Sequence, residues 1–125
     1  DLKRLAASFV ERFGSYSNQA NYGNIRDLKI FMSVKMKKWA DRFIKEEADK
    51  NTDSGIYYGI MTKAAAAQVN RFDNDSGLAE IMVNTQRRKA AGAPNNTVSF
   101  QQNIIVNFIK ENGVWKVDSA VWQKR

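Results

Sequence analysis

The alternation of apolar and polar residues from Ile56 to the end of the chain is the feature that most restricts the fold. Three turn signals interrupt it, at residues 73–77 (DNDSG), 91–96 (AGAPNN) and 112–113 (NG). The last is typical of a tight hairpin, because Asn and Gly both adopt positive φ readily. The only proline, Pro94, falls in the middle turn, where it interrupts no strand. The pattern therefore predicts four antiparallel strands.

The turns also predict which side chains share a face, because strand residues point alternately to two sides. Placing Glu111 opposite Val114 fixes the last hairpin. The expected pairs are Phe108 with Val117, Ile104 with Val121, Ile81 with Val106, Val83 with Ile104, Val69 with Ile81 and Ala67 with Val83. One face then collects Met61, Ala65, Ala67, Val69, Ile81, Val83, Val98, Phe100, Ile104, Val106, Phe108, Trp115, Val117 and Val121. Three independently placed turns agree on one apolar face, with Trp122 on the other.

Helical spacing before this region predicts three helices. Gly14 ends the first, Asn24 is expected to cap a short second one, and Ser33 is expected to cap the third. Their apolar faces are Leu2, Leu5, Ala6, Phe9, Val10 and Phe13; then Ile25, Leu28, Phe31 and Met32; then Met36, Trp39, Ala40 and Phe43. Residues 15–23 and 48–55 are expected to be loops. Trp39 and Trp115 are expected in the core.

Together these patterns predict the α+β fold class. Three N-terminal helices should pack on a curved four-stranded antiparallel sheet, and residues 1–125 should form a single domain, as a chain of this length usually does. A β-bulge, which is common in long bent strands, would move part of the apolar list to the other face.

Composition excludes several chemistries. The chain has no Cys and no His, which removes disulfides, thiolate metal sites and the commonest general base. We predict no cofactor and no metal site. The formal charge of +7 is spread, with +3 on residues 1–62 and +4 on residues 63–125. Such a surface suits an anionic partner, although a soluble cationic surface is the simpler explanation.

One end of the predicted apolar face turns polar near the middle hairpin. Lys63 is expected opposite Arg87, and Thr85 opposite Gln102, which in turn faces Gln123. Two cations facing each other across strands are destabilising unless an anion or a carboxylate joins them. We therefore predict a ligand-binding pocket mouth for a small anion. The alternative is a sheet that extends past the helices into water, with both cations paired to helix acids or snorkelling.

The C-terminal strand carries a family resemblance. Residues 111–123 read ENGVWKVDSAVWQ, and the Gly-x-Trp-x-Val pattern at Gly113, Trp115 and Val117 resembles the last strand of the nuclear transport factor 2-like superfamily. The resemblance covers nearly the whole chain as a pattern of elements. It implies a cone with a pocket between sheet and helices. Its members include isomerases, dehydratases, transport factors and membrane-anchored scaffold domains of bacterial secretion and conjugation machines, so fold alone does not choose a function. The short strand usual among the helices is not evident here.

An isomerase or dehydratase of this kind needs an acid or a histidine inside its pocket, with a pKa shifted by burial. The predicted register points Glu80 and Asp118 outward and leaves Glu111 at a turn. Asp27 and Asp41 on the helices are better explained as a cap or a solvated face. No catalytic residue is therefore predicted.

A nucleic-acid partner is a further interpretation, because residues 81–110 contain no acid but include Arg87, Arg88, Lys89 and Lys110. Aromatic residues do not alternate with these cations on the exposed face, as single-strand binding would require. This disfavours a nucleic-acid partner.

We therefore expect a non-enzymatic protein-interaction or scaffold domain that binds a protein partner or a second copy. The chain begins at Asp1 rather than Met, and no stretch approaches the roughly 18 apolar residues of a membrane span. With the resemblance, this suggests the soluble extracytoplasmic part of a bacterial protein held at the cell membrane by an N-terminal anchor. The cationic face between Lys35 and Lys45 would suit anionic headgroups. The alternative is a small-molecule-binding or isomerase/dehydratase-like enzyme that uses the cone pocket.

Overall fold

The computed structural model describes residues 1–49, 57–92 and 95–125. The elements are, in order, α1 (Leu2–Phe13), β1 (Tyr16–Ser17), α2 (Gly23–Leu28), the 3₁₀-helix η1 (Lys29–Phe31), α3 (Val34–Asp49), β2 (Tyr58–Asp73), β3 (Leu78–Ala91), β4 (Thr97–Glu111) and β5 (Val114–Trp122). The predicted turn at Pro94 and most of the predicted loop at 48–55 lie outside the described residues, but Ala48 and Asp49 belong to α3. No helix in the described ranges is long and apolar enough to cross a membrane.

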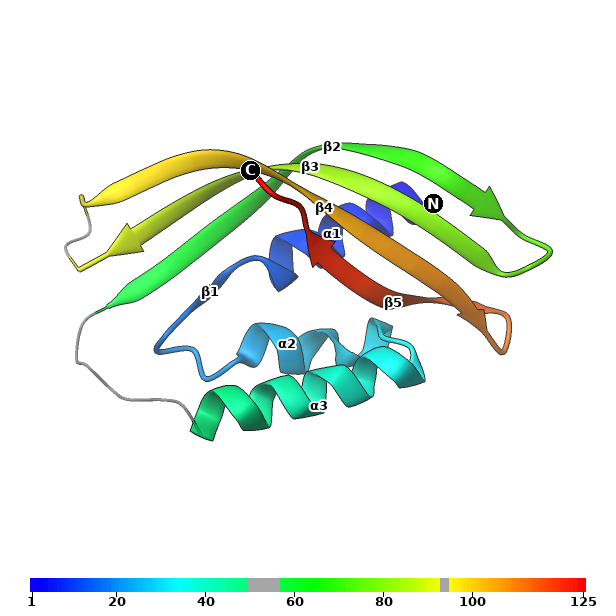
Figure 1. Cartoon of the computed structure of the whole chain (residues 1–125), viewed down its shortest axis with the longest axis horizontal. Helices are drawn as coiled ribbons and strands as arrows, with labels where there is room; N and C mark the ends of the chain where they lie inside the picture. The colour runs from blue at the N-terminus through cyan, green and yellow to red at the C-terminus, as the bar shows by residue number, and fades with distance from the viewer. Residues whose placement is uncertain (50–56, 93–94) are drawn as a thin grey trace.

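The sheet arches over the helices, with α1 directly beneath it and α3 farthest from it (Figure 1). The strand order is β1-β2-β3-β4-β5, and every neighbouring pair is antiparallel. The α+β class is confirmed, but the prediction of four strands was wrong by one. Tyr16 pairs with Ile60 and Ser17 with Gly59, inside the segment predicted as a loop. Two residues are too few to show any alternation in the sequence.

The predicted hairpins form. Glu111 pairs with Val114, and the turn between them has φ of 52° at Asn112 and 79° at Gly113. These positive values are the reason that the turn requires Asn and Gly. In the β2–β3 turn, the Asp73 carboxylate accepts hydrogen bonds from the backbone N–H groups of Ser76 and Asp75, which lowers the pKa of Asp73.

The predicted register is confirmed in the centre of the sheet. It is wrong beyond the unpaired residues Ala65 in β2 and Asp118 in β5. The confirmed pairs are Phe108 with Val117, Ile81 with Val106, Val83 with Ile104, Val69 with Ile81 and Ala67 with Val83. In β5, the unpaired residue Asp118 shifts the register, so Ile104 faces Trp122 and Val121 faces Ile105. Such bulges insert one residue and turn all later side chains over.

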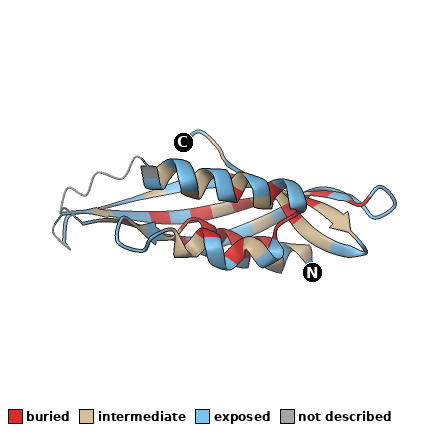
Figure 2. Cartoon of the chain, turned by 90° about the horizontal axis from the view of Figure 1, so that it is seen from below, coloured by how far each residue is buried: buried red, intermediate tan, exposed pale blue. Residues whose placement is uncertain are grey.

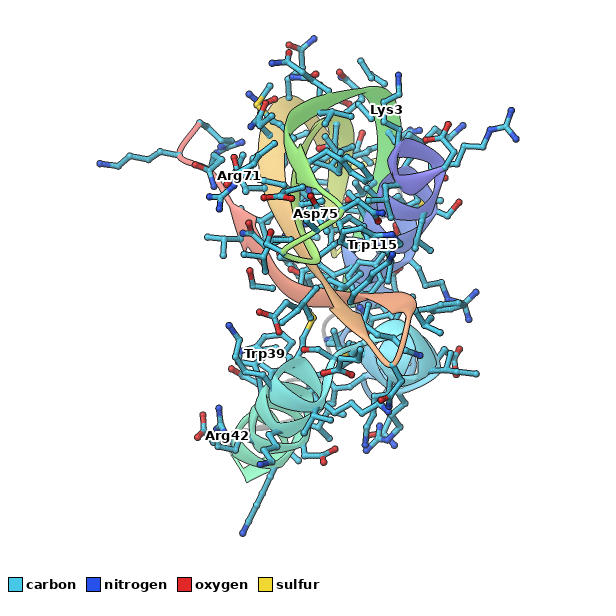
Figure 3. All side chains as sticks on the ribbon, turned by 90° about the vertical axis from the view of Figure 1, so that its right-hand side faces the viewer. Lys3, Trp39, Arg42, Arg71, Asp75 and Trp115 are labelled. Carbon is cyan, nitrogen blue, oxygen red and sulfur yellow. The ribbon has the colours of Figure 1, made fainter. Side chains whose placement is uncertain are left out.

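The core lies between the concave face of the sheet and the helices. It contains Ala6, Phe9, Val10, Phe13, Ile25, Leu28, Met32, Met36, Ala40, Ala79, Ile81, Val83, Ile104, Val106, Phe108 and Val117, with Trp39, Trp115 and Trp122 partly buried against it. The buried residues gather in the central part of the sheet and on the helix sides that face it (Figure 2). Trp39 lies on the side of α3 nearer the sheet, whereas Arg42 extends away from it (Figure 3).

Five residues that were predicted on the buried face are exposed: Met61, Ala65, Val69, Val98 and Val121. The bulges at Ala65 and Asp118 explain three of them, because Ala65 is itself an extra residue in β2, and Met61 and Val121 lie beyond a bulge. Val69 and Val98 lie toward the strand ends, beyond the residues that the helices bury. Trp122, predicted on the outer face, is turned to the inner one.

Helix α3 is anchored at its first residue. Ser33 Oγ accepts from Met36 N (3.1 Å), as the predicted cap should, and it donates to Asp118 Oδ1 (2.6 Å). Val34 N donates to Glu111 Oε2 (3.0 Å), which places two carboxylates at the positive end of the helix dipole. The predicted cap at Asn24 was wrong, because its side chain donates to Phe13 O (3.0 Å) instead.

Replacing Ser33 with alanine is expected to lower the free energy of unfolding by about 1 to 2 kcal/mol, since it removes the cap and the partner of Asp118. Urea denaturation followed by tryptophan fluorescence measures this change. Ser8→Ala, an exposed serine inside α1, is the matched control and should stay within about 0.5 kcal/mol of the parent. Equal effects of the two substitutions would contradict the anchoring role of Ser33.

Both edges of the sheet are partly occupied by groups from the helical region. On the β2 edge, Thr62 N donates to Ser15 Oγ and Ala64 N donates to Glu11 Oε2, both at 2.9 Å. On the β5 edge, Ser33 N donates to Val117 O (2.8 Å). These contacts replace hydrogen bonds that a neighbouring strand would otherwise make.

Candidate functional site

The charged side chain buried among the described residues is Arg87 of β3, which is 6% exposed. Its Nε donates to Thr62 Oγ1 (3.0 Å) and its Nη1 to Gln102 Oε1 (2.8 Å). Its Nη2 donates to Gly14 O (3.3 Å), at the end of α1. One guanidinium therefore joins the first helix to strands β2, β3 and β4.

An aromatic ring completes the surroundings of Arg87. The guanidinium carbon lies 3.7 Å from the centre of the Trp122 ring and 5.8 Å from that of Phe100. Trp122 reaches this position because the bulge at Asp118 turns it to the concave side. Gly14 permits the close approach, since a Cβ there would lie 2.6 Å from Thr62 Oγ1 and 2.8 Å from Trp122 Cζ2.

Four of the five residues predicted at the pocket mouth meet here. Thr85 Oγ1 donates to Gln102 O (2.6 Å), and Gln102 Nε2 donates to Gln123 O (2.8 Å), beside Arg87. Thr85 pairs with Gln102 as predicted. Lys63 does not join them: it pairs with Gln86 and is exposed. The extra residue Ala65 shifts β2, so Thr62 rather than Lys63 faces Arg87.

The sequence reasoning missed Gly14, Thr62 and Trp122 as members of this site. Thr62 and Trp122 were missed because each lies on the far side of a bulge from the turn that set its register. Gly14 was recognised only as a helix end. The signal that could have found Thr62 is its small polar side chain among apolar neighbours, since a buried Arg needs such an acceptor.

Arg87 has no carboxylate partner among residues 1–49, 57–92 and 95–125. The three ion pairs among the described residues are Arg12–Asp27, Lys29–Asp41 and Lys35–Asp118. Burial lowers the pKa of Arg87 below its ordinary value, and the positive charge of Arg125 adds to this effect. Arg125 lies over the other ring of this end, with its guanidinium carbon 4.1 Å from the centre of Phe100.

The two acids that were predicted to point outward, Glu80 and Asp118, have partners other than Arg87. Glu80 accepts from Asn70 Nδ2 (3.0 Å), and Asp118 accepts from Ser33 and Lys35 at the β5 edge. The buried polar side chains in the described ranges are Ser33, Thr62, Thr85 and Arg87. The same ranges contain no group of three or more His, Cys, Asp or Glu that could hold a metal ion. The chemistry available at this site is therefore recognition by a cation and neutral hydrogen-bonding groups.

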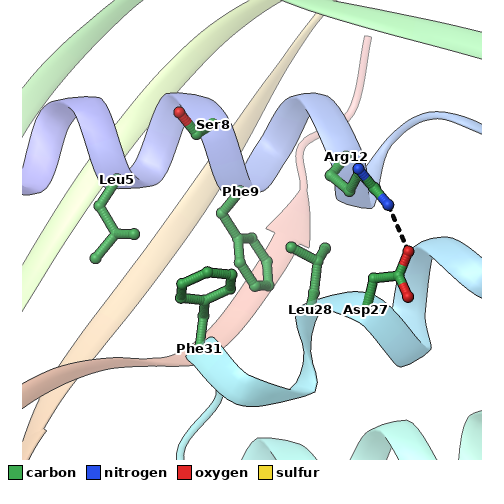
Figure 4. A pocket seen from close by; sticks show the side chains of 7 residues that line it. All are labelled: Leu5, Ser8, Phe9, Arg12, Asp27, Leu28 and Phe31. Atoms are coloured by element: carbon green, nitrogen blue, oxygen red, sulfur yellow. Dashed lines mark hydrogen bonds and ion pairs between the residues drawn. The ribbon is translucent and has the colours of Figure 1, made fainter.

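A second feature is an apolar cleft of about 310 Å³ between the helices (Figure 4). It is lined by Leu5, Ser8, Phe9, Arg12, Asp27, Leu28 and Phe31. It lies between α1 and the α2–η1 segment, not between helices and sheet as the cone expectation implied. Phe31 of this lining is also exposed, as are Ile30 and Val34 close to it in the chain. These three residues, here called the apolar corner, have exposed fractions of 44%, 68% and 57% in that order.

The fold and the site define an α+β domain whose helices fill the concave side of a bent antiparallel sheet. No protein-family model matches the sequence, and no curated protein matches it. Among solved structures, the chain is similar to CagV, a VirB8 homolog of the T4SS from Helicobacter pylori, with a TM-score of 0.67 and 14% identity over 99% of this chain and 97% of that one. It is also similar to the intermembrane space region of the chloroplast protein ARC6, with a TM-score of 0.55 and 16% identity over 98% and 97%.

At these identities the similarity shows the fold. The chain therefore has the fold of these two solved structures, which is consistent with the resemblance read from the C-terminal strand.

Proposed function

We propose that this chain is a non-enzymatic protein-interaction domain and the extracytoplasmic part of a membrane-associated bacterial protein. The similarity to a VirB8 homolog of the T4SS and to an intermembrane space region supports the proposal, because it extends over nearly the whole of each chain. A membrane anchor preceding Asp1 and a position at the outer side of the cell membrane belong to the same proposal.

The side chains of the concave face favour interaction over catalysis. The competing function, an isomerase or dehydratase, moves a proton with a buried acid or histidine. The buried polar groups in the described ranges are two threonines, one serine and Arg87, which cannot accept a proton near neutral pH. Among the described residues, Glu80 and Asp118 are engaged outside the core.

The observation that carries the proposal is the apolar corner beside the cleft. Exposed apolar surface of this kind marks an interaction site. The corner provides a protruding side chain, Ile30, and the neighbouring cleft provides a hollow, so one surface contains both halves of a contact. A surface of that kind is self-complementary and suits a two-fold dimer. In a two-fold contact the same surface faces itself, so it needs charged groups of both signs at its rim. Arg12 and Asp27, which line the cleft and form an ion pair, supply one of each sign. The occupant that we propose is a second copy of this chain.

Replacing Ile30 with aspartate is therefore expected to abolish self-association, since a buried carboxylate without a partner is strongly unfavourable at an interface. Sedimentation velocity over a concentration series measures the dimer fraction. Met61→Asp is the matched control, because Met61 is 65% exposed but points to the convex side of the sheet.

The parent and Met61→Asp should dimerise equally, and Ile30→Asp should remain monomeric. A parent chain that stays monomeric at every concentration reached would overturn self-association through this surface. So would a dimer that both aspartates weaken to the same extent.

A further inference from the structure

We propose that Arg87 and Arg125 form a binding site for an oxyanion, a carboxylate or a phosphate, at the end of the concave face where both guanidinium groups lie near the ring of Phe100. This site is separate from the apolar corner and goes beyond the proposed function. It involves β3, β4 and the residues that follow β5, whereas the corner belongs to η1 and α3.

The first reason is the unneutralised charge of Arg87. Buried charges in proteins are ordinarily paired. Arg87 takes part in none of the ion pairs of the described residues, and its side chain donates to neutral oxygens of Gly14, Thr62 and Gln102. With a further hydrogen bond to Tyr16, these bonds leave one of the five N–H groups of the guanidinium unused. An oxyanion held by the exposed Arg125 can therefore still accept from it.

The second reason is the neighbouring cation. The guanidinium carbons of Arg87 and Arg125 lie 5.8 and 4.1 Å from the centre of the same Phe100 ring. Two like charges held at one ring repel each other, and this repulsion is one of the causes that lower the pKa of Arg87. An anion between two guanidinium groups replaces that repulsion with two charge-assisted attractions.

The third reason is that the two strands that carry Arg87 and Phe100 offer no acid along most of their length. Residues 81–110, which include all of β4 up to its last residue, contain no Asp or Glu. Lys89 adds a further positive charge, 5.5 Å from the centre of the Tyr58 ring. Tyr16 also lies beside Arg87, and its hydroxyl is a hydrogen-bonding group for a bound oxygen. The chemistry is that of an oxyanion receptor with aromatic walls.

A purely structural arginine, satisfied by the Trp122 ring and three acceptors, is the competing explanation. It accounts for Arg87 but not for Arg125, which is exposed and is free to move toward solvent. The two explanations differ in one measurable respect. A structural arginine does not respond to a particular anion, whereas a receptor saturates with it.

The test uses the Arg87 Nε–H and Trp122 Nε1–H signals in ¹⁵N-resolved NMR spectra. Sodium phosphate and, in a separate arm, sodium succinate are titrated against sodium chloride at matched ionic strength. Both signals are expected to shift and saturate with at least one of the two oxyanions. Saturation with phosphate alone identifies a phosphate group as the ligand, and saturation with succinate alone identifies a carboxylate.

Arg125→Ala is expected to weaken this binding by about tenfold, the loss of one charge-assisted contact. Arg88→Ala is the matched control, since it removes the same charge from the next residue of β3, on the opposite face. Both side chains are exposed, so the fold should tolerate either change. Shifts that stay linear and match those in chloride would overturn the proposal, as would equal weakening by both substitutions. Neither result bears on dimerisation, which sedimentation measures separately.

Discussion

Arg87→Ala is expected to lower the free energy of unfolding by about 3 to 4 kcal/mol, because it removes several buried contacts at once. Thr62, Gln102 and the carbonyl of Gly14 each lose a donor, and the Trp122 ring loses the group stacked on it. Urea denaturation measures the change.

Arg88→Ala serves as the control here as well. Its side chain is exposed on the convex face, so we expect a change within about 0.5 kcal/mol. If both substitutions had the same small effect, Arg87 would not be holding α1 to the sheet. A large effect confined to Arg87 would establish that this one side chain joins four elements.

Gly14→Ala is expected to destabilise the fold by about 2 to 3 kcal/mol, the cost of overpacking a well-filled core. The reason is steric and not conformational. Gly14 has φ of −90°, which any residue adopts, but its added Cβ would lie well inside contact distance of Thr62 and Trp122. Both neighbours are held by contacts with Arg87, so neither moves aside without loss.

The matched control is Gly23→Ala at the first residue of α2. No atom lies within 4 Å of the position that its Cβ would occupy. The substitution should therefore stabilise the protein by about 0.4 to 1 kcal/mol through the reduced entropy of the unfolded chain. Thermal unfolding of the two variants should shift in opposite directions. A stabilised Gly14→Ala variant would show that the helix end can move away from the sheet.

The parts of the fold that could be predicted are those encoded by neighbouring residues. The hairpin at Asn112 and Gly113 follows from the φ values that these two residues allow, and it sets the pairing of Phe108 with Val117. Helix α1 ends at Gly14 and α3 begins after Ser33, as spacing and capping indicated. Such signals act over a few residues, so they can be read directly from the sequence.

The bulges could not be predicted, because their causes are distant in sequence. The unpaired Ala65 brings Thr62 under Arg87, 25 residues further along the chain. The unpaired Asp118 lets its carboxylate reach Ser33, which is 85 residues away. Neither Ala nor Asp marks a bulge locally. The errors at Lys63 and Trp122 both follow from this, since one inserted residue reverses every later side chain.

The candidate site was predicted in part for the same reason. Thr85 and Gln102 lie in the β3–β4 hairpin, where the register is regular, and their pairing was correct. Arg87 was correctly placed on the concave face, but Thr62 and Trp122 reach it across the bulges at Ala65 and Asp118, and Gly14 belongs to the end of α1. Burial of a cation also cannot be deduced from alternation, which treats Arg as a surface residue.

The occupied edges of the sheet have a consequence for crowding. Open strand edges are templates on which another chain can add, and this process leads to fibres. Here the side chains of Ser15 and Glu11 take the donors of Thr62 and Ala64 on one side, and Ser33 takes the acceptor of Val117 on the other. Many copies held close together, as in an assembly, can then contact one another through side chains without their sheets pairing edge to edge at these positions.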